Sequence, residues 1–264
     1  MWKTGWRTAS GNGGAKFPGW KRCSALFNLP DFPIKGLIET SFIDWKGQLA
    51  MVLFSGGCNF RCPFCHNSSL VLSHQSMAEV PMDHIVARLA KFRKWIEHVV
   101  ITGGEPTMHK GLPRVAEMLK RRDLLVKLDT NGSNPEVVKG LVADGLVDYV
   151  AMDVKGPLDA YDRWCGVGVD RERIRESIAF ILEEHVDYEF RMTLVPFLHR
   201  EEDALGVAEE IEGARRFFLQ EFVPRDTLNP KYAHIRPFSS EKMKTMRERV
   251  AAVLEHAPVS SHLH

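Results

Sequence analysis

The chain has 264 residues, of which 44% are hydrophobic and 26% are charged, and its formal net charge is +1. This composition is ordinary for a soluble globular protein, and the near-neutral charge argues against nucleic acid or a membrane surface as the main partner. No apolar run approaches the roughly 20 residues that span a bilayer, and the N-terminus lacks the apolar stretch of a secretory signal. We therefore expect a cytoplasmic protein.

The first 30 residues differ from the rest of the chain in composition. They include Trp2, Trp6 and Trp20, five basic residues and no acidic residue. We expect residues 1–30 to form a solvated arm, and residues 31–264 to form one domain. A docking arm for a large partner, or a translation start assigned too far upstream, would explain the same composition.

Regular apolar patterns begin near residue 37. Two apolar or β-branched runs, 37–43 and 49–54, flank residues 44–47 and predict a hairpin. Strand-like and helix-like stretches then alternate, and Asn134 is placed to cap one of the helices. We expect strands over 99–102, 124–129, 147–153, 188–195 and 217–223, and helices over 81–96, 111–122, 134–143, 171–184, 201–211 and 239–254.

This alternation predicts the fold class. Strands separated by helices of 10–15 residues indicate βαβ units and a parallel sheet. The units are too few for a closed barrel of eight. We therefore expect an α/β fold, a partial, open β/α barrel of about six parallel strands with an N-terminal hairpin.

Three of the five cysteines fall within eight residues, directly after a predicted strand. Cys58, Cys62 and Cys65 are separated by three and then two residues, so one loop can wrap them around a cluster. An odd, clustered set of cysteines is unlike a disulfide framework and indicates a metal site in a reducing compartment. Soft thiolates favour an iron–sulfur cluster or zinc.

The number of clustered cysteines favours an iron–sulfur cluster over zinc. Zinc usually takes four ligands, and the fourth would have to be Cys23, Cys165 or His66, which is adjacent to Cys65 and would strain the backbone. Three thiolates leave one iron of a 4Fe–4S cluster free to bind a small molecule. We therefore expect one such cluster, with Cys23 and Cys165 as inert thiols. A zinc knuckle or three buried structural cysteines are the alternatives.

The segment 58–67, Cys-Asn-Phe-Arg-Cys-Pro-Phe-Cys-His-Asn, resembles the signature of the radical S-adenosylmethionine (SAM) superfamily. Its form is similar to that of activases of glycyl-radical enzymes, and most of all to anaerobic ribonucleoside-triphosphate reductase activating proteins. The resemblance covers residues 29–237 and leaves out the first 28. It implies a 4Fe–4S cluster and SAM as cofactors.

The activity that the resemblance implies is that of an oxidoreductase. SAM at the open iron is cleaved reductively to methionine and a 5′-deoxyadenosyl radical, which takes a hydrogen atom from a glycine of a partner enzyme. A glycyl-radical enzyme is the implied partner, and a flavodoxin or ferredoxin-type protein is the implied electron donor. A radical SAM enzyme that acts on a small molecule or peptide is the first alternative. A non-catalytic zinc or electron-transfer protein is the second.

Polar residues recur at the ends of successive predicted strands, where β/α folds place their ligands. Gly103 and Gly104 follow one strand and leave backbone groups accessible, and Glu105 adds a carboxylate. A tight turn that caps a helix would use the same residues. The resemblance implies that these three grip the methionine amino group of SAM.

The next two strand ends carry residues of the same kind. Asp129, Thr130 and Asn131 form a polar turn, which the resemblance places against SAM, with Asp129 near a monovalent cation. Asp153 and Lys155 point to the same side of an extended chain, as a surface ion pair also would. The resemblance assigns Lys155 to the SAM carboxylate and Asp153 to ribose hydroxyls or to the cation.

Three further residues complete the predicted site. Arg191 lies on a mostly apolar strand, so it either faces the interior with the methionine carboxylate as its partner or lies exposed on the outer face. The resemblance places Phe64 near the cluster and the adenine, and His66 near the ribose or adenine. Formate-lyase activases have a late-strand histidine where this chain has residues 224–226, Pro-Arg-Asp, so the ribose contact is unassigned.

Overall fold

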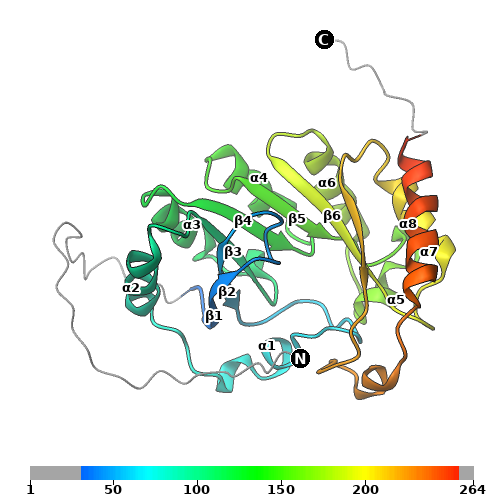
Figure 1. Cartoon of the computed structure of the whole chain (residues 1–264), viewed down its shortest axis with the longest axis horizontal. Coiled ribbons are helices and arrows are strands. Elements are labelled where there is room, and N and C mark those ends of the chain that lie inside the picture. Colours follow the sequence, from blue (N-terminus) through cyan, green and yellow to red (C-terminus); the bar gives the residue numbers. More distant parts are fainter. Residues whose placement is uncertain (1–30, 256–264) are drawn as a thin grey trace, which may run out of the picture.

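A seven-stranded sheet organises residues 31–255, the part of the chain that this computed structural model describes (Figure 1). The strands lie side by side in chain order. The first two form an antiparallel hairpin, and every later strand is parallel to its predecessor. They are β1 Ile34–Ser41, β2 Ala50–Ser55, β3 His98–Gly103, β4 Leu125–Thr130, β5 Tyr149–Asp153, β6 Asp187–Leu194 and β7 Phe217–Glu221.

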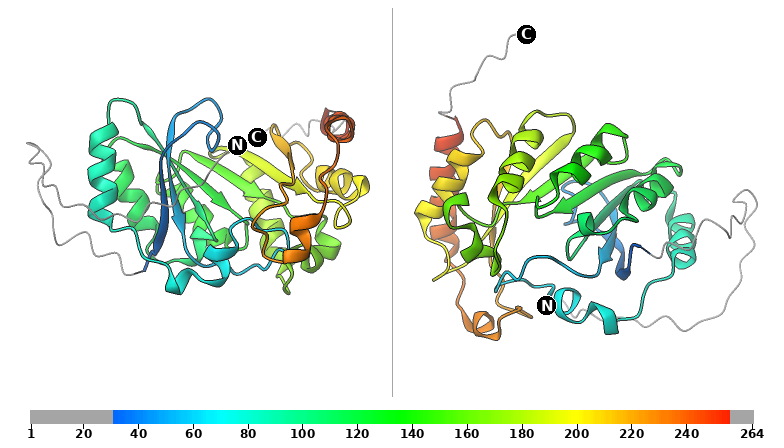
Figure 2. Two further views of the ribbon diagram at one scale, coloured as in Figure 1. Left: turned by 60° about the horizontal axis from the view of Figure 1, so that its bottom comes forward. Right: turned by 180° about the vertical axis from the view of Figure 1, so that it is seen from behind.

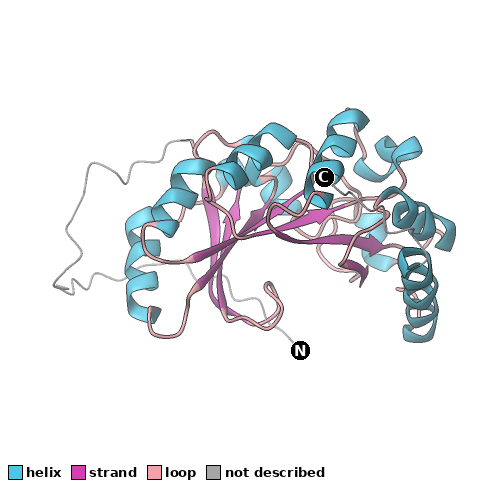
Figure 3. Cartoon of the chain, turned by 90° about the horizontal axis from the view of Figure 1, so that it is seen from above, coloured by secondary structure: helices cyan, strands magenta, loops and turns pink. Residues whose placement is uncertain are grey.

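Most of the helices lie along one face of the sheet and around its β7 edge (Figure 3). They are α1 Ser68–Leu72, α2 Met82–Phe92, α3 Leu112–Lys120, α4 Pro135–Ala143, α5 Tyr161–Cys165, α6 Arg171–Leu182, α7 Glu201–Glu210 and α8 Ser240–Glu255. Short 3₁₀ helices occupy His74–Ser76, Pro106–Met108, Leu158–Ala160 and Pro230–His234. Beyond β7, α7 and α8 pack together (Figure 2). None of the helices in the described part is long and apolar enough to cross a membrane.

The two faces of the sheet take part in different apolar layers, because successive residues of a strand point in opposite directions. In β3, Val99 and Ile101 belong to the main core beneath the helices, whereas Val100 belongs to a small cluster on the inner face. The helices complete the main core with apolar stripes, as Ile85 and Leu89 do on α2. Burial of this apolar surface is the main stabilising contribution to the fold.

The turn of the hairpin closes the amino-terminal end of the inner face. Trp45 is buried there with its ring 4.8 Å from that of His98 and 5.6 Å from that of Tyr149. The Asp44 carbonyl, next to it, accepts a hydrogen bond of 2.9 Å from the Lys127 ammonium group. The inner face is therefore closed at the end where the parallel strands begin.

The predicted architecture is confirmed: β2 to β7 are six parallel strands of an open sheet, and β1 forms the N-terminal hairpin with β2. The helix predicted over 81–96 ends at Phe92, because a tight turn, with the Trp95 N–H bonded to the Phe92 carbonyl at 2.8 Å, redirects the chain into β3. Asn134 does precede α4, but its side chain does not cap the helix. Its amide instead donates to Thr107 Oγ1 at 3.0 Å. The arm predicted over 1–30 lies outside the described residues.

The carboxyl ends of β2 and β3 approach each other through their backbones. Gly104 N donates to Ser55 O at 2.9 Å, and Glu105 N donates to Gly57 O at 2.8 Å. A Cβ atom on Gly104 would lie 1.7 Å from Gly57 O, and one on Gly103 would lie 2.4 Å from Ser55 O. Glycine at these two positions is therefore a steric requirement of the contact between the two loops.

A buried histidine joins the loops that follow β5 and β6. His199 Nδ1 accepts from the Val195 N–H at 3.1 Å, so Nε2 carries the proton and donates to Lys155 O at 2.8 Å. Its ring stacks on Trp164 at 4.7 Å, and the Phe64 ring lies 5.8 Å away, edge-on. Burial of this ring lowers the pKa of His199 to about 4. The neutral imidazole thus fixes the position of Lys155.

Replacing Gly104 with alanine is expected to lower the melting temperature. The added methyl group would overlap Gly57 O, so the loops after β2 and β3 must separate, at a cost of about 1–3 kcal/mol in unfolding free energy. Gly140→Ala in α4 is the control, because its Cβ would have no neighbour within 4 Å, and alanine favours a helix by up to about 1 kcal/mol. Circular dichroism melting that gave both variants the same melting temperature would contradict the steric explanation.

We expect His199 to make the fold less stable as the pH falls below 6.5. The unfolded chain takes up a proton near the ordinary pKa of 6.5, whereas the folded ring does so only near about 4. Between these values the unfolded state binds more protons, so the free energy of unfolding decreases as the pH decreases, by about 3 kcal/mol over the full shift.

The variant His199→Asn isolates this contribution. It is expected to be less stable than the wild type at pH 7, but to lose less stability between pH 6.5 and 4, since it has no ring to protonate. Urea denaturation at a series of pH values measures the difference. Profiles that run parallel for the two proteins would show that His199 is not responsible.

Candidate active site

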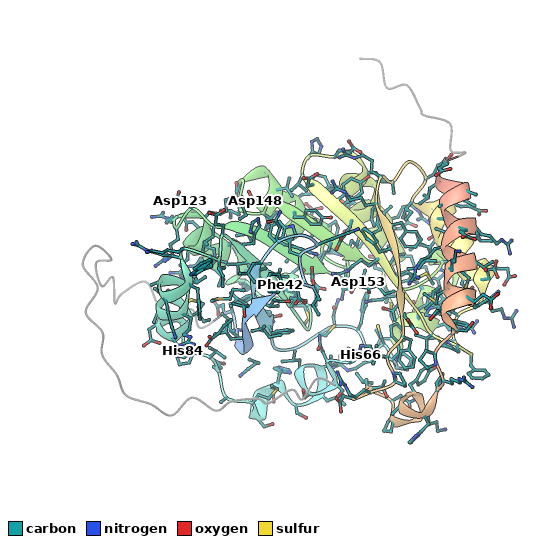
Figure 4. The ribbon with its side chains drawn as sticks, in the orientation of Figure 1. Phe42, His66, His84, Asp123, Asp148 and Asp153 are labelled. Atoms are coloured by element: carbon teal, nitrogen blue, oxygen red, sulfur yellow. The ribbon has the colours of Figure 1, made fainter. Side chains whose placement is uncertain are left out.

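A pocket of about 210 Å³ opens at the carboxyl ends of the parallel strands. Figure 4 shows that β5 runs toward this pocket. Asp148, just before β5, lies in the upper part of the view, and Asp153, the last residue of β5, lies nearer to His66, which lines the pocket. Every predicted site residue except Arg191 lines this pocket: Cys58, Cys62, Phe64, Cys65, His66, Gly103, Gly104, Glu105, Asp129, Thr130, Asn131, Asp153 and Lys155. The predicted residues of four successive segments, 58–66, 103–105, 129–131 and 153–155, therefore meet in one place.

The cysteine loop, residues 56–67, is held by segments far from it in the sequence. The Arg61 N–H donates to the Cys165 carbonyl at 2.7 Å, and the Leu228 N–H donates to the Cys65 carbonyl at 3.0 Å. These bonds connect the loop to the end of α5 and to the segment after β7. The shape of the loop is thus set by the completed fold.

The three thiols of this loop differ in their electrostatic surroundings. Burial, reinforced by the nearby Glu105 carboxylate, raises the pKa of Cys58 to about 12, and burial also raises the pKa of Cys65. The pKa of Cys62 is lowered instead, because the Cys165 thiol donates a hydrogen bond to the Cys62 sulfur and outweighs burial, with the charge of Lys155 adding to the effect. Cys165 thus influences Cys62 across a sequence separation of 103 residues, from the end of α5.

The arrangement of the thiols fits the 4Fe–4S cluster predicted from the sequence. The three sulfurs border one pocket, but within residues 31–255 no three His, Cys, Asp or Glu side chains could share a single metal ion. A cubane cluster contacts each thiolate through a different iron, so its ligands surround a volume and do not converge on a point. The site thus has the donor chemistry for a cluster, with an open pocket beside the thiols.

Glu105 is a buried carboxylate that joins the loops after β3 and β4. Its Oε1 accepts from Thr107 N at 3.1 Å and from Thr130 Oγ1 at 2.8 Å, and its Oε2 accepts from Asn131 N at 2.7 Å. Burial raises the pKa of Glu105 in spite of these bonds. Its partners in the described part of the chain are all neutral donors. A cationic group of a ligand would therefore be favourable beside it.

Arg191 pairs with carboxylates of the protein and lies outside the pocket lining. It faces the inner side of the sheet, but its guanidinium is already paired: Nε donates to Asp153 at 2.8 Å and Nη1 to Asp129 at 3.3 Å. It does not line the pocket. The interior orientation is correct, whereas the partners are carboxylates of the protein, because a buried charge requires a counter-charge whether or not a ligand is bound.

Asp153 has cations on both sides. Lys155 lies 3.2 Å from the carboxylate oxygen that Arg191 does not contact. Burial opposes ionisation, but the charges of Arg191 and Lys155 lower the pKa of Asp153 to about 2. The ammonium group of Lys155 has three N–H donors and uses one on Asp153, so it can also donate to a ligand in the pocket that it lines.

His66 and two residues at the strand ends form the far wall of the pocket. The His66 ring stacks on Phe222 at 5.8 Å, and burial lowers the pKa of His66. Thr193 of β6 donates to Gln220 of β7 at 3.4 Å, and both line the pocket. Sequence reasoning missed these two residues, although Thr193 follows Arg191 at the spacing of two that puts both on one face of a strand.

Comparison with known proteins agrees with this geometry. The family model of the radical SAM superfamily matches residues 52–206. A protein of Methanocaldococcus jannaschii named "Putative glycyl-radical enzyme activating enzyme" is 32% identical over 209 residues, which cover 75% of this chain and 83% of that protein. The 7-carboxy-7-deazaguanine synthase of Aquifex aeolicus is 40% identical over 77 residues, 29% of this chain and 33% of the synthase.

Among solved structures, that of Streptococcus suis SuiB bound to S-adenosylmethionine has a TM-score of 0.59 at 15% identity, and the match covers 79% of this chain and 49% of SuiB. That likeness concerns the fold. The family match spans more than half of the chain and includes the cysteine loop and strands β3 to β6. The chain belongs to the radical SAM superfamily, and it is an enzyme that uses SAM and a 4Fe–4S cluster held by three cysteines.

Proposed function

We propose that this radical SAM enzyme installs a glycyl radical on a partner enzyme such as an anaerobic ribonucleotide reductase. The observation that carries the proposal is the match to the glycyl-radical enzyme activating relative, which spans 83% of that protein and so includes more than the shared cofactor domain. An open sheet supports it, because a partial barrel leaves room at its side for a loop of a polypeptide. A flavodoxin or ferredoxin-type protein is the proposed electron donor.

In this proposal Cys58, Cys62 and Cys65 hold the cluster. The chemistry supplied by the bound cluster and SAM is reductive cleavage to methionine and a 5′-deoxyadenosyl radical. The protein has to hold SAM, align its 5′-carbon with the substrate hydrogen and keep water away. No acid–base side chain is required for hydrogen-atom transfer, so we assign none.

The electrostatics of the pocket match the methionine part of SAM. Glu105, an anion bonded to neutral donors, suits the amino group, and Gly103 and Gly104 leave backbone groups close by. Lys155, with spare donor capacity beside Asp153, suits the carboxylate. Ammonium and carboxylate thus each meet an opposite charge from a different strand end.

The adenosine part would lie along the remaining wall. Phe64 and His66 offer aromatic faces for the adenine. Asp153, or the Thr193–Gln220 pair, offers acceptors for the ribose hydroxyls, and this pair would take the place of the late-strand histidine of formate-lyase activases. Thr130 and Asn131 shape the loop beside them, and Asp129 stays the proposed contact of a monovalent cation.

Replacing Lys155 with methionine is expected to weaken SAM binding about 10- to 100-fold, which corresponds to losing a charged hydrogen bond of about 1.5–3 kcal/mol. Asp153 keeps Arg191 as its partner, so no buried carboxylate is left unpaired. Lys139→Met is the control, because Lys139 lies on the outer surface of α4 and pairs with Glu176. Equilibrium dialysis with cluster-loaded protein measures the affinity, and an unchanged dissociation constant for Lys155→Met would refute the role.

The function itself is tested by electron paramagnetic resonance. Protein reconstituted anaerobically and reduced is mixed with SAM and a purified glycyl-radical enzyme. We expect a glycyl radical signal together with 5′-deoxyadenosine in equal amount, and neither product with Cys62→Ala. A partner whose radical glycine is replaced by alanine should give no signal.

A different result would select the alternative. Formation of 5′-deoxyadenosine without any glycyl radical, in the presence of the reductase from the same organism, would contradict the proposal. It would favour a small-molecule or peptide substrate. The short match to 7-carboxy-7-deazaguanine synthase is the observation that supports this alternative. Such a substrate would then be sought among metabolites that increase the yield of 5′-deoxyadenosine.

A further inference from the structure

Lys155 lies just beyond the carboxyl end of β5, where regular pairing of the sheet gives way to a loop. Val154 still bonds to β6, through its N–H and the Arg191 carbonyl at 2.9 Å. The backbone of Lys155 is held by two side chains instead: its N–H donates to the Tyr161 hydroxyl at 3.2 Å, and its carbonyl accepts from His199 Nε2 at 2.8 Å. Backbone groups away from water require partners, and side chains supply both of them here.

The two side chains come from different segments that meet at Lys155. Tyr161 is the first residue of α5, and His199 belongs to the loop after β6. Their exposed fractions are 0% and 2%, and neither of them lines the pocket, whereas Lys155 does. They therefore do not contact a ligand in the pocket, and their effect on such a ligand is indirect.

Packing fixes this arrangement in turn. The His199 ring stacks on Trp164 at 4.7 Å, and Trp164 Nε1 donates to the Pro157 carbonyl at 3.2 Å. A Cβ atom on Gly156 would lie 2.5 Å from the Trp164 ring, so only glycine lets the chain after Lys155 pass this close to the ring. The residues that follow Lys155 are therefore packed against the residues that hold its backbone.

The Lys155 side chain is thus held at both of its ends. Its ammonium group donates to Asp153 at 3.2 Å, and its backbone is held by Tyr161 and His199. An unrestrained lysine has many rotamers, and freezing them when a ligand binds lowers the affinity. A backbone that is fixed beforehand reduces this loss.

We propose that Tyr161 and His199 are positioning residues for SAM: they hold the backbone of Lys155 so that its ammonium group meets the carboxylate of SAM. The inference rests on the proposed role of Lys155 in binding this carboxylate. It does not depend on the identity of the substrate, so it can hold or fail independently of the activase function.

The test is equilibrium dialysis of SAM against full-length, cluster-loaded protein at pH 7. Tyr161→Phe removes only the hydroxyl and is expected to raise the dissociation constant about three- to tenfold, the effect of one lost hydrogen bond. Tyr188→Phe is the matched control, because Tyr188 is also buried and its hydroxyl accepts from the Arg215 N–H at 3.1 Å, near the start of β6 and outside the pocket lining. Its affinity for SAM should equal that of the wild type.

Two amide variants separate the hydrogen bond of His199 from its packing. The amide of glutamine can place a donor where Nε2 lies, whereas the shorter asparagine can replace only Nδ1. His199→Asn is expected to weaken SAM binding about as far as Tyr161→Phe does, and His199→Gln is expected to retain most of the affinity. Equal losses in the two amide variants would indicate a packing effect and would overturn the positioning role of His199.

A double-mutant cycle tests whether the effect passes through Lys155. The ammonium group is absent in Lys155→Met, so adding Tyr161→Phe to this variant should cause no further loss of affinity. A loss of the same size in both backgrounds would overturn the proposal, because Tyr161 would then act without Lys155.

The remaining outcomes distinguish this proposal from the role of Lys155 on which it rests. Wild-type affinity in Tyr161→Phe, together with weakened binding in Lys155→Met, would overturn only the positioning. Wild-type affinity in Lys155→Met would overturn the carboxylate contact and the positioning together. Decarboxylated SAM, which lacks the group in question, is expected to bind equally to the wild type and to Tyr161→Phe, and a weaker binding to the variant would contradict the proposal.

Discussion

The site depends first on the backbone contact between the ends of β2 and β3. Two hydrogen bonds, from Gly104 to Ser55 and from Glu105 to Gly57, join these strand ends where regular sheet pairing stops. Asn67 adds a third bond across the same gap, from its side-chain amide to Gly103 O at 2.8 Å. Because of this contact, the loop that carries the cysteines and the loop that carries Glu105 border one pocket. A side chain at either glycine would separate them.

The second constraint is charge on the inner face of an open sheet. Lys127 of β4 is buried and pairs with Glu189 of β6 at 2.8 Å, and Arg191 lies between two carboxylates. Paired buried charges contribute little to stability relative to apolar residues, but breaking one pair is costly, so each residue holds its neighbour in one orientation. These paired side chains form a row on the inner face, from the end of the sheet that Trp45 closes toward the pocket. It ends at Lys155, the cation left facing the ligand space.

These two constraints place an acidic and a basic side chain, Glu105 and Lys155, in one pocket. Glu105 is fixed by neutral donors from the loops after β3 and β4, and Lys155 is fixed through Asp153 and through the bond of its carbonyl to His199. A zwitterionic group between them would find a counter-charge at each end. The Cys165 thiol and the positive charge of Lys155 both lower the pKa of Cys62. Residues outside the pocket, Cys165 of α5 and His199 of the loop after β6, thus influence Cys62 and Lys155.

Local patterns were sufficient to predict most of the fold and the location of the site. Apolar periodicity predicts the alternation of strands and helices, because burial on one face is a property of each segment by itself. The cysteine spacing and the residues at 103–105, 129–131 and 153–155 are likewise local, since each set lies in one loop. Parallel strands then bring all of these loops to the same edge of the sheet. The fold class therefore sufficed to predict that they meet.

The sequence by itself thus determined the element order, the cluster of three cysteines and the polar strand ends. Only the tertiary structure decided the pairings between side chains. Arg191 binds Asp153 and Asp129, Asn134 binds Thr107 where a helix cap was expected, and Cys165 meets Cys62. Each of these contacts joins segments that are far apart in the chain, and a buried polar group accepts whichever partner the packing brings within reach. Their geometry is a property of the assembled sheet and helices, which no single segment encodes.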